Sequence, residues 1–120
     1  MIRFVQDKQL KDPQLWQLAA EQFTAAVDDV DLGWRGEYWG KLMRGACMTW
    51  EYTQDAALYQ LLADTVDALL GCQDEAGRIS TYSPAQEFQG WDLWCRKYVL
   101  LGLWHFHQIC QDARQKQRIE

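Results

Sequence analysis

The sequence has no excess of positive charge. Its 12 Lys and Arg residues are outnumbered by 17 Asp and Glu residues, which gives a formal net charge of -5 at pH 7. A surface that binds DNA or RNA needs clustered cations to neutralise phosphates. We therefore expect no nucleic acid partner.

The sequence also lacks a long hydrophobic run. Its longest uncharged apolar stretches, such as residues 98–108, fall well short of the roughly 20 residues that cross a bilayer. Arg3, Asp7 and Lys8 interrupt the N-terminus, so the apolar segment of a secretory signal cannot form there. We expect no membrane association and a cytoplasmic location.

Motifs for metals and phosphates are missing as well. His105 and His107 lie two residues apart on a predicted helix, so they cannot bind one metal from a single face. Gly33 and Gly36 belong to no phosphate-binding loop sequence. The four cysteines include no Cys-x-x-Cys pair, and we expect buried, reduced thiols rather than a disulfide framework or zinc ribbon at Cys47, Cys72, Cys95 and Cys110. No metal or other cofactor is expected.

What is present is the composition of one soluble globular domain. The chain has 120 residues, of which 48% are hydrophobic and 24% are charged. These fractions are close to the average for folded proteins, and the length suits a single core. We expect residues 1–120 to form a single helical domain.

Two segments show the one-sided apolar pattern of outer helices. Asp12 and Pro13 form a helix start signal, and apolar residues follow at helical spacing to about residue 28. A second stripe, rich in leucine, begins after Asp55 and closes at Gly71. We expect both helices to cover an inner layer.

Two further segments, 38–53 and 92–111, carry apolar residues on nearly every side of the helical wheel. Helices of that kind are usually buried. A weak repeat between residues 45–55 and 102–112 supports the same alternation. We therefore predict an all-α fold of two antiparallel hairpins, each of which pairs an outer helix with an inner one.

The two connections from outer to inner helices are long. Residues 28–37 and 71–90 lie at the same end of an antiparallel series, which we call the rim. Long structured loops on a rigid scaffold are typical sites of binding and catalysis. Residues 78–83 alternate in polarity and could form a short β segment within the second connection.

The rim combines aromatic side chains with carboxylates and amides. Such a surface suits a sugar, whose C–H faces pack on indole rings while its hydroxyls bind polar groups. Glu37 and Asp92 begin the two inner helices and could form a carboxyl pair. The alternative is that the tryptophans pack the helix entries and that the two carboxylates favour the positive ends of the helix dipoles.

Several sequence blocks resemble one enzyme family. They are WRGEYWGKLMRGA at 34–46, YTQD at 52–55, GRISTYS at 77–83, GWDLW at 90–94 and RKYVLLG at 96–102. In this order they resemble the N-terminal part of the β-L-arabinofuranosidases of glycoside hydrolase family 127. The likeness covers roughly residues 30–112.

The resemblance implies an (α/α)6 toroid, a ring of alternating outer and inner helices, of which this chain would form about one third. In the best-understood branch of the family, a zinc-bound cysteine is the nucleophile and a glutamate is the acid/base. Both come from later segments of the toroid, which are absent here. The resemblance also implies six substrate-facing candidates: Glu37, Trp39, Gln73, Asp74, Trp91 and Asp92.

One block departs from the family pattern. Many members carry histidines where this chain has Trp91 and Tyr98, so the resemblance does not by itself assign the chain to the arabinose-specific branch. Cys95 aligns outside the zinc-ligand motifs, so no metal role transfers. We expect a truncated fragment of a glycoside hydrolase-like toroid whose rim faces carbohydrate. We expect this fragment to have no catalytic activity on its own. The alternative is a helical interaction module that forms homo-oligomers through its inner helix faces.

Overall fold

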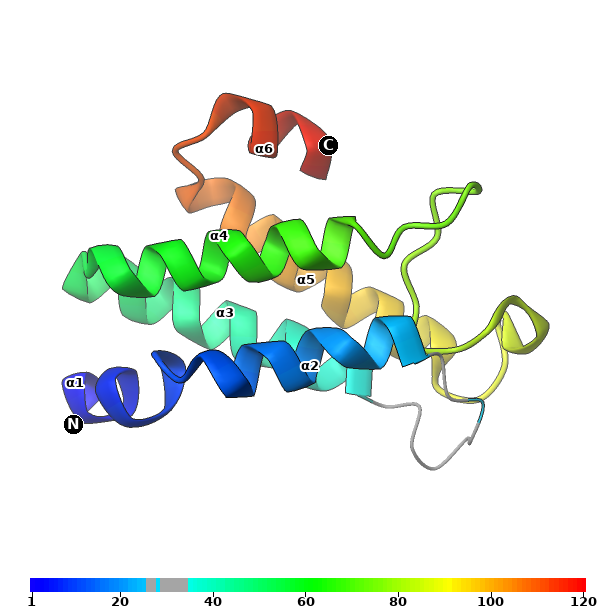
Figure 1. Cartoon of the computed structure of the whole chain (residues 1–120), viewed down its shortest axis with the longest axis horizontal. Coiled ribbons are helices and arrows are strands. Elements are labelled where there is room, and N and C mark those ends of the chain that lie inside the picture. Colours follow the sequence, from blue (N-terminus) through cyan, green and yellow to red (C-terminus); the bar gives the residue numbers. More distant parts are fainter. Residues whose placement is uncertain (26–27, 29–34) are drawn as a thin grey trace.

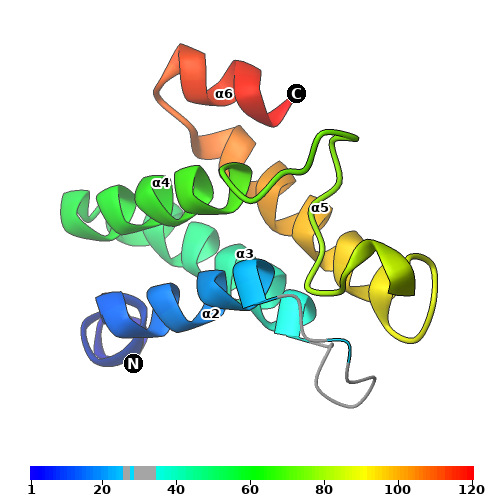
Figure 2. The ribbon, with the colours of Figure 1, turned by 45° about the vertical axis from the view of Figure 1, so that its right-hand side comes forward.

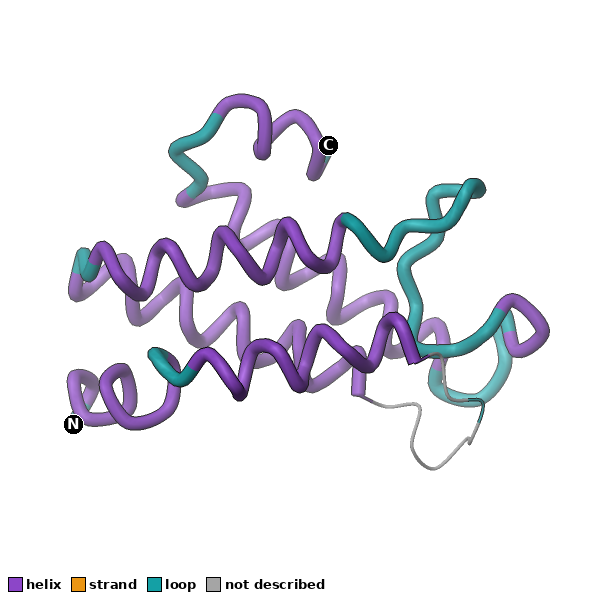
Figure 3. The backbone as a smooth tube through the Cα atoms, viewed as in Figure 1, coloured by secondary structure: helices purple, strands orange, loops and turns teal. Residues whose placement is uncertain are grey.

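The computed structural model describes residues 1–25, 28 and 35–120. In this part the chain is helical and contains no strand (Figure 3), and none of its helices is both long and apolar enough to cross a membrane. The α-helices are α1 (Ile2–Val5), α2 (Pro13–Ala25), α3 (Arg35–Thr53), α4 (Ala56–Leu70), α5 (Asp92–Ile109) and α6 (Ala113–Ile119), with a π-helical turn η1 (Gln6–Leu10) and a 3-10 turn η2 (Pro84–Gln86). The all-α prediction is confirmed.

The helices form two layers. α2 and α4 make the outer layer, and α3 and α5 lie behind them (Figures 1 and 2). α3 runs antiparallel to α2, and α5 runs antiparallel to α4, so the two predicted hairpins are confirmed (Figure 1). α2 and α4 end, and α3 and α5 begin, at the same end of the molecule (Figure 1). The described part of the rim lies there.

α4 shows how the sequence sets these layers. The Asp55 carboxylate caps its N-terminus by accepting a hydrogen bond from the backbone N–H of Leu58 at 2.8 Å. Leu58, Leu62, Val66 and Leu69 recur on one side of the helix and are fully buried. Each such side chain contributes about 1.5–3 kcal/mol when it leaves water.

The two inner helices approach each other at two glycines. A Cβ atom on Gly40 would lie 2.0 Å from the carbonyl oxygen of Tyr98, and one on Gly102 would lie 2.9 Å from the Trp39 ring. The buried Trp39 indole fills the adjoining space and donates a hydrogen bond to the Thr65 hydroxyl at 3.2 Å. The backbones are therefore in contact, and neither glycine position has room for a side chain.

Neither inner helix is buried on every side. Leu100 and Trp104 of α5 are 66% and 56% exposed, and Met48 and Tyr52 of α3 are 47% and 74% exposed. The expectation that both helices are buried all round is therefore wrong. The outer side of α5 carries apolar residues that no described element covers.

Residues 78–83 do not form the short β segment that their alternation allowed. A strand needs a neighbour for its backbone hydrogen bonds, and the described residues offer none. Instead, the backbone N–H groups of Arg78 and Tyr82 donate to the side chains of Asp74 and Ser80, at 2.8 and 3.1 Å. Side-chain acceptors thus replace the partner strand.

The helix ends differ a little from the prediction. α5 ends at Ile109 because Cys110 adopts an extended conformation, and Asp112 then caps the separate helix α6. α2 ends at Ala25, and residues 26–27 of the predicted helix lie outside the described part. The N-terminal turns α1 and η1 were not predicted.

Candidate functional site

The described rim is built mainly by residues 71–91, the loop between α4 and α5. Its first turn closes on Asp74, whose carboxylate accepts hydrogen bonds from the backbone N–H groups of Ala76 and Arg78 at 3.0 and 2.8 Å. The Gln73 amide donates to the carbonyl of Gly77 at 3.0 Å, and Gly77 takes a φ of 81°. Gln73 and Asp74 therefore shape this turn, and both are exposed.

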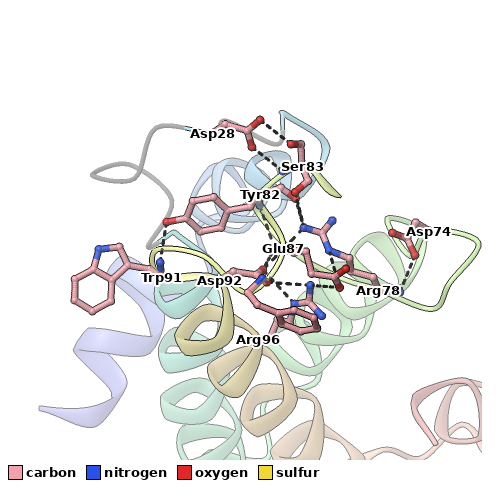
Figure 4. A network of polar contacts seen from close by, with 11 residues as sticks. Asp28, Asp74, Arg78, Tyr82, Ser83, Glu87, Trp91, Asp92 and Arg96 are labelled. Atoms are coloured by element: carbon pink, nitrogen blue, oxygen red, sulfur yellow. Dashed lines mark hydrogen bonds and ion pairs between the residues drawn. The ribbon is translucent and has the colours of Figure 1, made fainter. Parts of the chain in front are cut away.

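The second half of the loop folds around Asp92, whose side chain is fully buried at the start of α5. Its carboxylate accepts hydrogen bonds from the Ser80 hydroxyl and, at 2.9 Å, from the backbone N–H of Phe88 (Figure 4). Phe88 has a φ of 63°, a left-handed conformation that is uncommon for a large side chain. Asp92 thus joins two distant points of the loop to α5.

Two arginines complete the surroundings of Asp92. Arg96 lies one turn later, and its guanidinium is 3.0 Å from Asp92 and 2.8 Å from Glu87. Arg78 approaches Asp92 at 4.0 Å and donates a hydrogen bond to the carbonyl of Tyr82 at 2.6 Å. Arg78, Glu87, Asp92 and Arg96 are called the Asp92 network below (Figure 4).

The loop is held at its outer edge as well. Ser83 donates to the Asp28 carboxylate from both its backbone N–H, at 2.8 Å, and its hydroxyl, at 2.6 Å. Tyr82 is buried beside it, and its hydroxyl accepts a hydrogen bond from the backbone N–H of Trp91 at 3.3 Å. The loop is therefore an ordered platform rather than a loose connection.

Both rim carboxylates that could serve as acid or base are held in the ionised state. A hydrogen bond from the Lys41 ammonium lowers the pKa of Glu37. Burial acts to raise the pKa of Asp92, but hydrogen bonds from Ser80, the loop backbone and Arg96 outweigh burial, and the pKa is lowered. The general acid of a glycosidase needs a raised pKa. Neither group has one in this structure.

Aromatic side chains cover the outer side of the first turns of α5. Trp91 and Trp94 are 48% and 41% exposed, with their ring centroids 6.5 Å apart. Trp94 meets Tyr98 edge-on at 5.3 Å, and the Lys97 ammonium lies 3.4 Å from the centroid of the Trp94 ring. Exposed indole surface of this kind packs well against the C–H face of a sugar ring.

The structure separates the loop residues among the predicted candidates into two groups. Trp91 and Asp92 adjoin at the start of α5, whereas Gln73 and Asp74 share the first turn of the loop. Figure 4 shows Trp91 and Asp74 on opposite sides of the Asp92 network. A ligand that touches both must therefore extend across the platform.

The two candidates on α3 have different surroundings. Glu37 forms an ion pair with Lys41 one turn later, so its carboxylate is engaged there and not with Asp92. Trp39 is fully buried and packs edge-on against Phe23, with the ring centroids 6.3 Å apart. Trp39 therefore belongs to the core beneath the rim.

Several members of the site were not among the six predicted candidates, Arg96 and Ser80 included. Arg96 follows Asp92 by four positions, a spacing that brings opposite charges together on one helix face. That signal was readable from the sequence. Ser80 gave no comparable signal, because its contact with Asp92 depends on how the loop folds back on α5.

The described residues of this chain do not form a site like the zinc-bound cysteine of the family that the sequence resembles. A thiolate is the form that binds zinc, and burial raises the pKa of the Cys95 thiol. No three potential ligand side chains converge anywhere in the described part of the chain. No step through zinc is therefore assigned to these residues.

Comparison with known proteins gives a family match. The sequence model of a family described as the β-L-arabinofuranosidase GH127 catalytic domain matches residues 4–117, nearly the whole chain. No curated protein and no solved structure matches the chain.

Proposed function

Because this chain belongs to the β-L-arabinofuranosidase GH127 catalytic-domain family, we propose that it is part of a glycoside hydrolase-like α/α toroid whose rim faces carbohydrate. The observation that carries the proposal is the exposed indole of Trp91 next to an ordered, hydrogen-bonded platform. Stacking surface beside fixed polar groups is the usual composition of a sugar site.

The candidates divide into contact and support roles in this proposal. The exposed Trp91 and the carboxylate of Glu37 are proposed to contact the sugar, together with the turn formed by Gln73 and Asp74. Asp92 and Trp39 are fully buried, so we assign them the support of the platform and of the inner helix. A bound sugar would lie across the loop rather than in an enclosed pocket.

We further propose that this chain alone does not hydrolyse glycosides. Retaining and inverting glycosidases need two positioned catalytic groups, usually carboxyls, and the acid must hold a proton near neutral pH. The lowered pKa values of Glu37 and Asp92 support the absence of such an acid. The rim as described would bind a sugar without turning it over.

Titration with oligosaccharides, followed by NMR, tests the binding site. We expect weak binding with shifts at the indole of Trp91 and in residues 71–91. Trp91→Ala should weaken binding about fivefold or more, since an aromatic contact contributes about 0.5–1.5 kcal/mol beyond its buried area. Tyr52→Ala, which removes another exposed aromatic residue near the opposite end of α3, is the matched control and should bind normally.

Two outcomes would count against the proposal. If the oligosaccharides caused no NMR shifts, or if the two variants weakened binding equally, the carbohydrate site would not lie on the rim. If the purified chain hydrolysed any compound in a panel of nitrophenyl glycosides, the proposal that it is inactive on its own would be contradicted.

The exposed side of α5 favours a second candidate function, a self-associating interaction module. Leu93, Leu100 and Trp104 are more than half exposed, and adjoining apolar side chains of this size usually mark an interface. The sequence predicts association through the inner helices, and this stays a prediction. Light scattering that gave a stable 14.1 kDa monomer throughout the micromolar range would contradict it.

A further inference from the structure

Two apolar surfaces of this molecule are open, and they carry opposite charges. The first, the α5 face, consists of Leu93, Lys97, Leu100, Leu101 and Trp104 on the outer side of α5. These residues border a hollow of about 1030 Å³. The second is a groove between α2 and α4, called the α2–α4 groove.

The hollow at the α5 face is bordered by two cations, Lys97 and Arg44, that form no ion pair with a carboxylate in the described part of the chain. The charge of Lys97 does contribute to lowering the pKa of Glu37. Lys97 lies over the rings of Trp94 and Tyr98, and Arg44 of α3 borders the same hollow. Arg96 also borders the hollow and binds Asp92. One carboxylate borders the hollow among the described residues, that of Glu120, which lies 3.0 Å from the imidazole of His107.

The α2–α4 groove has the complementary character. Its volume is about 510 Å³, and apolar and small side chains border it, among them Trp16, Ala20, Leu61 and Ala68. Glu21 and Asp64 border it from the two helices that form the groove. They accept hydrogen bonds from Gln17 and Gln60, each at 2.8 Å, and neither has a cation partner among the described residues.

The two surfaces are comparable in length. The hollow is bordered along α5 from Leu93 to His107, and the groove is bordered along α2 from Pro13 to Thr24. These spans are fourteen and eleven helical steps, about 21 and 16 Å at 1.5 Å per residue. A helix ridge packs into a groove of comparable length when the ridges and grooves interdigitate.

We propose that the α5 face of one copy of this chain docks into the α2–α4 groove of a second copy. In this arrangement Lys97 and Arg44 of the first copy lie against Glu21 and Asp64 of the second. The proposal rests on the second function proposed above, self-association, and specifies which surfaces meet. Apolar contact supplies the attraction, and the charges select the partner surface.

The charges also disfavour the simpler, symmetric arrangement. In a symmetric dimer built from two α5 faces, Lys97 of each copy would lie near Lys97 of the other, and like charges at an interface are costly. The proposed contact has no such conflict. It is heterologous, because two different surfaces of the molecule meet.

A heterologous contact leaves one surface of each copy free. The outer layer (α2 and α4) and the inner layer (α3 and α5) lie on opposite sides of the thin body (Figure 1), so one copy can use both surfaces at once. Association therefore continues beyond a dimer into stacks or rings, depending on whether the rotation closes.

Charge reversal, followed by analytical ultracentrifugation of the full chain, tests the proposal. One variant, R44E/K97E, makes the α5 face acidic, and another, E21K/D64K, makes the groove basic. Each alone should raise the dissociation constant at least tenfold, because attraction becomes repulsion. The control K8E/R114E makes the same change in net charge as R44E/K97E at exposed sites outside both surfaces and should associate like the wild type.

A mixture of the two variants provides the decisive measurement. The acidic α5 face of R44E/K97E is complementary to the basic groove of E21K/D64K, so an equimolar mixture should recover association that neither variant shows alone. Misfolding cannot produce such recovery. Circular dichroism of each variant checks that the helices are intact.

The failures are distinguishable. Association of the wild type that neither reversal weakens, or a mixture that stays monomeric, would overturn the docking inference while self-association stands. A wild-type chain that is monomeric throughout the micromolar range would overturn both. Binding of the monomer to a synthetic acidic amphipathic helix would then assign the α5 face to a different occupant.

Discussion

Arg96 binds both carboxylate oxygens of Asp92, with Nε 3.1 Å from Oδ1 and a terminal nitrogen 3.0 Å from Oδ2. The aspartate is fully buried, whereas the guanidinium is partly exposed and also binds Glu87. A pair with this geometry combines charge with two directed hydrogen bonds. It holds the first turn of α5 and the end of the preceding loop in one arrangement.

Replacement of Asp92 should destabilise the fold strongly. Asp92→Ala removes the acceptor for Ser80, Phe88 and Arg96, and loss of one partner of a buried ion pair costs roughly 3–5 kcal/mol. Urea denaturation measures this change. Glu75→Ala, a change to an exposed carboxylate in the same loop, should alter the free energy of unfolding by less than about 0.5 kcal/mol. Equal effects of the two changes would show that the Asp92 network is not a structural centre.

The lowered pKa of Asp92 predicts a pH dependence of stability. A carboxyl whose pKa is lower in the folded than in the unfolded chain stabilises the fold above the unfolded value and loses this contribution as pH falls through the folded value. For Asp92 the loss should begin near its ordinary pKa of 3.8 and continue below it.

Comparison with Asp92→Asn isolates this contribution. The variant should be less stable than the wild type at pH 7, and the difference should shrink steadily as the pH falls below 3.8. Denaturation curves at several pH values measure the difference. A gap that stayed constant with pH would mean that Asp92 does not titrate with folding. Other aspartates with lowered pKa values, such as Asp55, remain in both proteins.

The contact between the inner helices predicts opposite effects at two glycines of α3. Gly40→Ala places a Cβ atom 2.0 Å from the carbonyl oxygen of Tyr98, so α3 and α5 must move apart, at a cost of about 3 kcal/mol, the upper end of the usual range for overpacking. A Cβ atom on Gly45 would have no neighbour within 4 Å among the described residues, and Gly45→Ala should stabilise the helix by up to about 1 kcal/mol. Thermal unfolding of the two variants checks both signs. A tolerated Gly40→Ala would contradict the close approach of the helices.

The four thiols should react in two groups. Cys47 and Cys95 are buried, and burial raises the pKa of Cys47 to about 12. Cys72 and Cys110 are partly exposed. Iodoacetamide at about pH 8, near the ordinary pKa of a thiol, should therefore modify Cys72 and Cys110 first and reach the other two only when the chain unfolds. Mass spectrometry over time gives the order, and early modification of Cys95 would show that the loop opens under native conditions.

The sequence predicted the helices better than it predicted their exposure. The stripe of Leu58, Leu62 and Leu69 specified one buried side, and Asp55 marked the start of α4. Apolar residues all round α5 indicated burial on every side, but Leu100 and Trp104 are exposed. A helical wheel reports which sides can be buried, whereas the presence of a covering element is a property of the whole assembly.

The rim was harder to predict because its contacts are not periodic. The i, i+4 spacing of Asp92 and Arg96 follows from helix geometry. The alternation of residues 78–83 did not specify a strand, because the acceptors for this backbone are the side chains of Asp74 and Ser80. Such contacts depend on the path of the whole loop, which no local pattern encodes.

The glycine contact between α3 and α5 also constrains how the domain can move. Since Gly40 rests directly on the backbone of Tyr98, sliding or rotation of one inner helix past the other would break this contact. We therefore expect the two helices to move together, so that any adjustment of the platform to a bound molecule takes place in residues 71–91.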